Sequence, residues 1–152
     1  MPTVSIHLSG MHHTGIVVRD LAAMERFYVG QLGLTKLKEI DSIAPPGGNH
    51  TGVPDARRKL LFLELTAGGH QIELVHYLSP PASPGGLDKH QLGAMHICFT
   101  VDDIEAVYAQ LSAQGVQFAT EPKYSEVDGR RIGVVYAQDP EGNWLEFIGG
   151  KL

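Results

Sequence analysis

The chain has 152 residues, of which 43% are apolar and 19% charged, and its formal net charge is −5. This length and composition are typical of one globular domain or two small half-domains, and they argue against intrinsic disorder. The acidic charge balance argues against a nucleic acid partner, and every apolar run falls short of the ~20 residues that a membrane-spanning helix needs.

The first half of the chain is expected to contain a strand, a helix and three further strands. The spacing of apolar residues predicts a strand over 11–18, a helix over 21–32 ended by Gly33, and a strand over 34–40. A long Pro- and Gly-containing loop over 42–57 then leads to two strands, over 59–66 and 70–77, joined by a turn. The densest basic group, Arg57-Arg58-Lys59, is interpreted as a solvated loop edge.

The second half repeats this order. Residues 78–92, rich in Pro, Gly and Ser, are the predicted linker between a first module over 11–77 and a second module over 93–149. The expected elements of the second module are a strand over 94–101, a helix capped by Asp102 or Asp103 and ended by Gly115, a short strand over 116–119, a polar loop over 121–131, a strand over 132–137, a turn over 139–143 and a strand over 144–148. The predicted fold class is therefore α+β, with two tandem βαβββ modules.

A histidine opens the repeated segment in both halves. His13 stands seven residues before Asp20, and His96 stands seven residues before Asp103. Because side chains alternate along a strand, His96 lies on the face opposite the uniformly apolar positions of its strand, and superposition of the copies places His13 likewise. The two histidines are thus expected to point away from the helices.

Each half also ends on a strand with one glutamate between large apolar residues. Glu73 lies in QIELV and Glu146 in WLEFI. An ionised carboxylate in such a strand is costly unless it is paired or bound to a metal ion. Two His and two Glu side chains would make a divalent metal site. The alternatives from the residues alone are hydrogen-bonded core histidines and glutamates on the wet face of an edge strand.

Four stretches resemble the vicinal oxygen chelate superfamily, which includes glyoxalase I, methylmalonyl-CoA epimerase, extradiol dioxygenases and bleomycin- and fosfomycin-resistance proteins. They are HHTGIVVRDLAAMERFYVGQLGL, QIELV, MHICFTVDDIEAVYAQLSAQGVQF and DPEGNWLEF, and they span most of residues 11–149. In that family, paired βαβββ modules form a cupped mixed sheet around one metal ion. The resemblance therefore implies that His13, Glu73, His96 and Glu146 bind one divalent ion, namely Ni, Co, Mn, Zn or Fe.

The four-ligand set is similar to that of the glyoxalase and epimerase members. It implies a metal-dependent isomerase or lyase that stabilises the enolate or enediolate of a small carbonyl substrate. Glu146 is the expected base, and Glu73 is its counterpart on the opposite face of the substrate. The arginine and asparagine with which glyoxalase I binds glutathione correspond here to Val17 and Tyr77, so glutathione is not the expected substrate.

Two other functions fit the same resemblance. An Fe(II) extradiol dioxygenase would use His13, His96 and Glu146, although Glu73 would then occupy the open coordination position. A resistance-type binding protein would bind a small molecule without turnover, but such members lack the metal ligands. Four intact ligand positions therefore favour the isomerase or lyase.

The remaining expectations concern assembly, location and loops. The resemblance implies a homodimer, and the single Cys98 indicates a reducing, cytoplasmic location. The N-terminal segment shows no signal-peptide pattern, which agrees with that location. Loops 42–57 and 124–131 are the predicted lids, and Arg130 or Arg131 is expected to meet an anionic group of the substrate.

Overall fold

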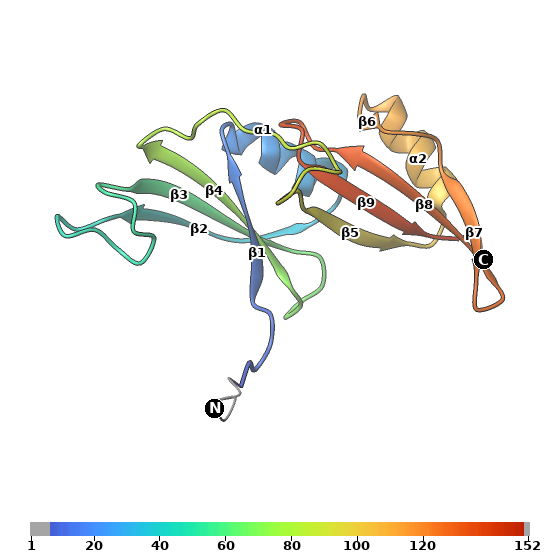
Figure 1. Cartoon of the computed structure of the whole chain (residues 1–152), viewed down its shortest axis with the longest axis horizontal. Helices are drawn as coiled ribbons and strands as arrows, with labels where there is room; N and C mark the ends of the chain where they lie inside the picture. Colours follow the sequence, from blue (N-terminus) through green and yellow to red (C-terminus); the bar gives the residue numbers. More distant parts are fainter. Residues whose placement is uncertain (1–6, 151–152) are drawn as a thin grey trace. The chain divides into compact units, whose positions relative to one another are not determined.

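The computed structural model describes residues 7–150, which form two compact units, each with its own sheet (Figure 1). Of the described residues, the first unit comprises 7–21 and 28–82, and the second comprises 22–27 and 83–150. Within residues 7–150, no helix is both long and apolar enough to cross a lipid bilayer.

A four-stranded mixed sheet forms the first unit. Its strands are β1 (His13–Val18), β2 (Thr35–Ile43), β3 (Arg57–Glu64) and β4 (Gln71–Ser79), in the spatial order β1-β4-β3-β2. β1 runs parallel to β4, and the other pairs are antiparallel. The central strands β3 and β4 are apolar on both faces, because Leu61 and Leu74 are fully buried on one face while Leu60 and Val75 are buried on the other.

The predicted helix over 21–32 consists of two segments. α1 (Leu21–Glu25) is α-helical, and η1 (Arg26–Gln31) is a π-helix. The π-helix, with its i→i+5 hydrogen bonds, accommodates two consecutive buried aromatic residues, Phe27 and Tyr28. Gly33 ends the segment with a φ of +80°, as predicted.

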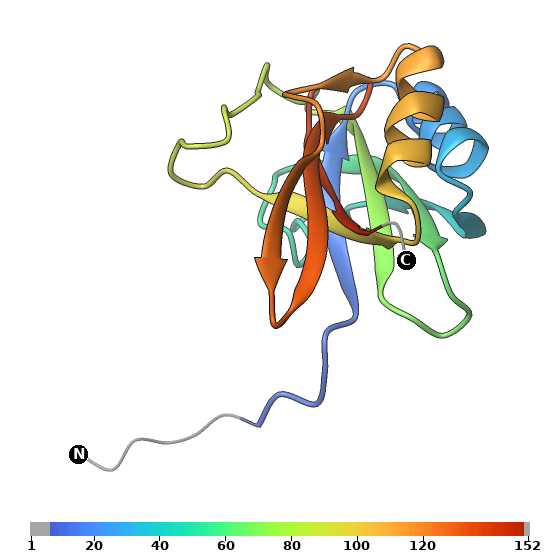
Figure 2. The ribbon, with the colours of Figure 1, turned by 90° about the vertical axis from the view of Figure 1, so that its right-hand side faces the viewer.

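The second unit repeats the topology of the first. Its elements are β5 (His96–Val101), α2 (Ile104–Ala113), β6 (Gln117–Phe118), β7 (Lys123–Val127), β8 (Arg130–Gln138) and β9 (Trp144–Gly149). The sheet order is β5-β9-β8-β6, with β7 also paired to β8, and β5 runs parallel to β9 as β1 does to β4. Figures 1 and 2 both show α2 along one face of this sheet. The predicted fold class, two tandem βαβββ modules with mixed sheets, is confirmed.

The prediction of a polar loop over 121–131 is wrong. Residues 123–127 form β7, which pairs antiparallel with β8. Most of the predicted lid over 124–131 therefore consists of paired strand residues rather than a loop. The connection is a two-residue turn at Asp128 and Gly129, with φ angles of 50° and 73°. Asp-Gly is the sequence that such hairpin turns prefer, because both central residues need a positive φ.

A buried carboxylate stabilises the turn that precedes the last strand, β9. Asp139 is buried and accepts hydrogen bonds from the main-chain nitrogens of Glu141 and Asn143 and from the Asn143 amide. The turn lies at the predicted position, 139–143, and its geometry fixes the register in which Gln138 pairs with Trp144.

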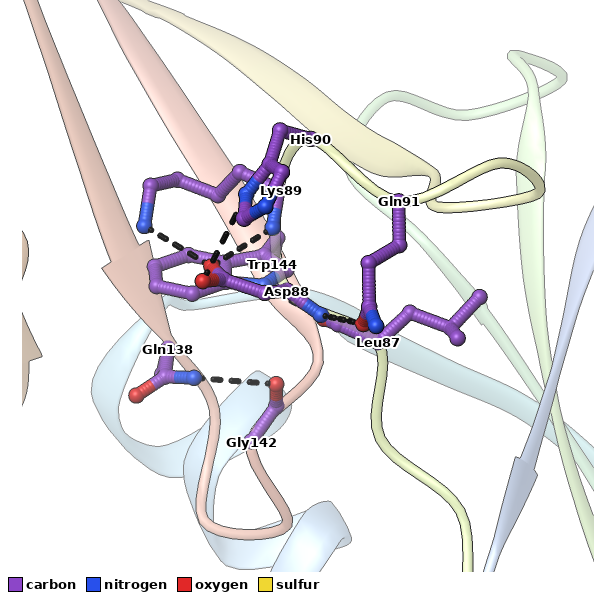
Figure 3. Close-up of polar contacts among 8 residues, drawn as sticks. All are labelled: Leu87, Asp88, Lys89, His90, Gln91, Gln138, Gly142 and Trp144. Atoms are coloured by element: carbon purple, nitrogen blue, oxygen red, sulfur yellow. Dashed lines mark hydrogen bonds and ion pairs between the residues drawn. The ribbon is translucent and has the colours of Figure 1, made fainter.

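The segment before β5 is attached to the start of β9 (Figure 3). The Trp144 indole donates a hydrogen bond to the main-chain oxygen of Leu87 at 2.9 Å. The Lys89 ammonium lies 3.9 Å from the centroid of the Trp144 ring and 3.2 Å from the Asp88 carboxylate. The end of the predicted linker is thus packed against the second sheet.

Asp103 is the residue that caps α2, which settles the choice between Asp102 and Asp103. Its carboxylate accepts from the main-chain nitrogen of Ala106 at 3.0 Å. Asp103→Ala is expected to lower the free energy of unfolding by about 1 kcal/mol, since one helix donor then loses its acceptor. Urea denaturation measures this loss. The exposed Asp102→Ala variant is the matched control, and an equal loss there would contradict the assignment.

Candidate metal centre

The first histidine–glutamate pair lies within the first unit. His13 Nε2, at the start of β1, is 3.1 Å from Glu73 Oε2 on β4. The Glu73 side chain is only 14% exposed, whereas that of His13 is 38% exposed. The second imidazole nitrogen of His13 is engaged separately, because its Nδ1 lies 2.7 Å from His12 Nδ1. The Nε2 atom is therefore the one available beside the carboxylate.

The second pair has the same form in the second unit. His96 Nε2, at the start of β5, lies 2.8 Å from Glu146 Oε2 on β9. Glu146 is 16% exposed and His96 is 42% exposed. Each unit therefore presents one nitrogen and one oxygen donor, with the carboxylate largely buried and the imidazole open to solvent.

Matched strand registers produce the two pairs. Glu73 is paired in the β1–β4 ladder with Gly15, two residues after His13. Glu146 is paired in the β5–β9 ladder with Cys98, two residues after its own histidine. Since side chains two residues apart on a strand share a face, the histidine and glutamate meet in both units. Within each unit, the predicted histidine and glutamate therefore lie on one face of the sheet.

The surroundings of the two glutamates differ. The antiparallel partner of Glu73 is Phe62, whose ring meets the His13 ring edge-on at 5.9 Å. The partner of Glu146 is Tyr136, whose ring meets the His96 ring at 5.1 Å. A phenol in the second unit therefore replaces a phenyl ring in the first.

Two protonated groups surround Glu146. Burial raises the pKa of the Tyr136 phenol, and the negative charge of Glu146 raises it further. Burial also raises the pKa of the Cys98 thiol, with added effects of the charge of Glu146 and of a hydrogen bond to it. Both groups therefore keep their protons at neutral pH and can donate hydrogen bonds on this face.

The face of the first sheet that carries His13 also carries cations and an apolar cluster. Lys38, on β2, places its ammonium 4.8 Å from the Phe62 ring centroid. Leu60, Phe62 and Val75 form a buried cluster against which Tyr77 packs. The interpretation of Arg57-Arg58-Lys59 as a solvated loop edge is wrong, because these residues begin β3 and Arg58 is only 7% exposed.

In the two segments expected to contact substrate, several side chains interact with neighbouring protein groups. Between β2 and β3, the Asn49 side chain accepts hydrogen bonds from the main chain and hydroxyl of Thr51. In the second unit, the Arg131 guanidinium lies 4.2 Å from the Tyr124 ring centroid, and the Tyr124 hydroxyl donates to Glu105. Arg131 is therefore held on the β7–β8 ribbon.

The donor chemistry of the two pairs fits a divalent metal ion. Imidazole nitrogen and carboxylate oxygen are ligands that Zn and neighbouring transition metals accept, and two carboxylates balance a 2+ charge. Across residues 7–150, however, no group of three or more His, Cys, Asp or Glu side chains is gathered that could hold a metal ion. Each unit by itself thus offers two donors, whereas such an ion typically takes four ligands.

Pattern reasoning identified both pairs but missed Tyr136, Phe62 and Arg58. A signal for Tyr136 was present, because the turn over 139–143 pairs residue 138 with residue 144 and thereby residue 136 with Glu146. Arg58 had no comparable signal, since its burial depends on where β3 begins.

Comparison with known proteins identifies a family. A model described as the Glyoxalase/Bleomycin resistance protein/Dioxygenase superfamily matches residues 10–147. A lactoylglutathione lyase of Schizosaccharomyces pombe is 29% identical over 150 residues, which cover 91% of this chain and 46% of that protein. The human mitochondrial methylmalonyl-CoA epimerase is 26% identical over 92% of this chain and 73% of that protein. The chain spans about half the length of the S. pombe relative.

A solved structure has the same fold. A glyoxalase family protein from Bacillus cereus aligns with a TM-score of 0.82 and 22% identity, covering 98% of this chain and 97% of the other. At this level of identity, the likeness supports the fold alone.

Proposed function

Because the chain belongs to the Glyoxalase/Bleomycin resistance protein/Dioxygenase superfamily, we propose that it is a metal-dependent isomerase or lyase acting on a small carbonyl substrate. The observation that carries this proposal is the matched pair of histidine–glutamate contacts, at 3.1 and 2.8 Å, in the two units. Relatives named as a lactoylglutathione lyase and a methylmalonyl-CoA epimerase support the reaction class.

In this proposal, His13, Glu73, His96 and Glu146 hold one divalent ion. Each unit supplies one nitrogen and one oxygen, so both pairs are needed to complete four ligands. Two copies of the chain in a homodimer, or one chain alone, would provide them. Ni, Co, Mn, Zn and Fe all accept this donor set.

When bound, a divalent ion polarises a substrate carbonyl and stabilises the negative charge that develops on its oxygen. The Glu146 carboxylate accepts the proton from the carbon next to that carbonyl and returns it elsewhere on the substrate, and Glu73 is its counterpart on the opposite face. The proton that leaves the substrate is returned to it, so the step is a proton transfer without net oxidation. The protonated phenol of Tyr136 borders the base and is a hydrogen-bond donor on the same face.

Metal analysis of the purified protein tests this proposal. The expected result is one divalent ion for each set of four ligands, with His13→Ala and His96→Ala each lowering metal affinity by more than about 100-fold, since loss of an outer partner alone costs 10–100-fold. The exposed His50→Ala variant is the control and should bind as the wild type does.

The activity itself is measured as proton exchange in D₂O, with a 2-oxoaldehyde hemithioacetal or an acyl-CoA as substrate. Absence of bound metal, together with no activation by Ni, Co, Mn or Zn, would overturn the proposal. Tight binding of a small molecule without exchange would instead favour a resistance-type binding protein.

A further inference from the structure

Arg58 is a buried cation at the beginning of β3. It is 7% exposed, whereas its neighbour Arg57 is exposed. Its Nη2 donates a hydrogen bond to the Ser42 hydroxyl at 3.1 Å, and its guanidinium carbon lies 5.7 Å from the Tyr77 ring centroid. These two neutral groups orient the guanidinium but do not neutralise it.

The guanidinium lacks a counter-ion among the described residues. No Asp or Glu within residues 7–150 forms an ion pair with Arg58, and its buried Nε finds no hydrogen-bond acceptor there. A buried charge with an unsatisfied donor is unfavourable unless an anion neutralises it. Arginine is also the side chain best suited to a carboxylate or phosphate, because its planar fork donates two parallel hydrogen bonds.

Strand alternation places Arg58 on the same face as the first histidine–glutamate pair. Arg58, Leu60 and Phe62 are successive residues on one face of β3, and Phe62 is paired with Glu73. Arg58 and Phe62 are four positions apart on the extended strand, which corresponds to about 13 Å between their main-chain positions. The buried apolar cluster of Leu60, Phe62 and Val75 lies between the cation and the pair.

We propose that Arg58 is the binding site for an oxyanion at the far end of an elongated substrate whose carbonyl lies at His13 and Glu73. The assignment rests on the proposed function for the location of the carbonyl, and it specifies the substrate class as a carbonyl compound with a carboxylate or phosphate group remote from the reacting carbon. Ser42 and Tyr77 act as positioning residues for the guanidinium.

Binding of simple amphiphiles to the metal-free protein tests the site independently of catalysis. Octanoate, octyl phosphate and the neutral octanamide are titrated calorimetrically in the presence of EDTA. The wild type is expected to bind octanoate or octyl phosphate at least about 10-fold more tightly than octanamide, which reflects a charge-assisted hydrogen bond. The relative affinities of the two anions identify the oxyanion as a carboxylate or a phosphate.

Variants locate the cation responsible. Arg58→Gln is expected to weaken anion binding by about 10- to 100-fold without changing octanamide binding, while exposed Arg57→Gln is expected to bind as the wild type does. Arg58→Lys keeps the charge but loses the fork, so an intermediate loss is expected. If circular dichroism shows that Arg58→Gln does not fold, Arg58→Lys is the variant that tests the site. Equal binding of all three amphiphiles by the wild type, or loss of anion binding in Lys38→Gln rather than in the Arg58 variants, overturns the proposal.

A final measurement separates this inference from the proposed function. Arg58→Gln should retain the metal affinity of the wild type, because Arg58 is absent from the ligand set. With an anionic carbonyl substrate, it should raise KM by about 10-fold or more while kcat changes little. Failure of metal binding in the wild type would overturn the proposed function but leave the amphiphile result standing. Normal metal binding with an unchanged KM in Arg58→Gln would overturn the role of Arg58.

Discussion

Replacing Glu146 with glutamine is expected to lower the rate of proton exchange by at least about 10²-fold, because the variant loses both the proposed general base and one of the four proposed metal ligands. The amide is nearly isosteric with the carboxylate but does not accept the proton. The side chain is largely buried beside His96, so a substitution of similar shape should leave the fold intact. Exchange in D₂O and circular dichroism of the same samples measure both properties.

The paired substitution Glu73→Gln is the matched comparison, because Glu73 occupies the equivalent register in the first unit. The four-ligand proposal predicts that this variant loses metal affinity and exchange activity together. Unchanged metal affinity would favour the Fe(II) dioxygenase layout, in which two histidines and one glutamate suffice. Oxygen consumption with a catechol substrate would then be the observation that replaces the isomerase or lyase proposal.

Substituting Gly149 with alanine is expected to lower the free energy of unfolding by about 3 kcal/mol, at the upper end of the cost of overpacking. A Cβ atom at Gly149 would lie 1.9 Å from the main-chain oxygen of Val101, its partner in the β5–β9 ladder. A main-chain atom does not rotate away as a side chain does, so the two strands would have to separate. These strands carry His96 and Glu146, so metal affinity should fall as well.

Urea denaturation of Gly149→Ala measures this effect, with Gly85→Ala as the control. A Cβ atom at Gly85 would meet no atom within 4 Å, so that variant should unfold at the urea concentration of the wild type. Equal midpoints for Gly149→Ala and the wild type would mean that the β5–β9 ladder tolerates an additional atom and would contradict this prediction.

The order of elements and the histidine–glutamate pairs were predictable because both follow from short-range sequence patterns that occur once in each half of the chain. His13 was identified by its correspondence with His96, and the structure brings His13 Nε2 to 3.1 Å from Glu73 Oε2. The shared placement of Glu73 and Glu146 came from their apolar neighbours in the final strand of each half. Because the pattern occurs twice, equivalent positions in the two halves could be compared within one chain.

Other features depended on pairing between strands that a linear pattern does not specify. β7 has only five residues and a polar composition, so its strand character comes from the ladder it forms with β8. The burial of Arg58 follows from the start of β3 at Arg57, two residues before the predicted start at residue 59. The π-helical turn departs from the α-helical period on which the prediction was based, and it contains the two consecutive buried residues Phe27 and Tyr28.

The position of β1 and β5 at one end of their sheets has a consequence for folding. The residues of the two pairs are far apart in sequence, His13 and Glu73 by 60 positions (73 − 13) and His96 and Glu146 by 50 (146 − 96). Strand pairing across such separations carries a larger loop-closure entropy than the hairpins beside it and is expected to form late. The imidazole–carboxylate contacts join β1 to β4 and β5 to β9, the strand pairs that are expected to form last. The side chains proposed as metal ligands therefore also stabilise the final strand pairing of each module.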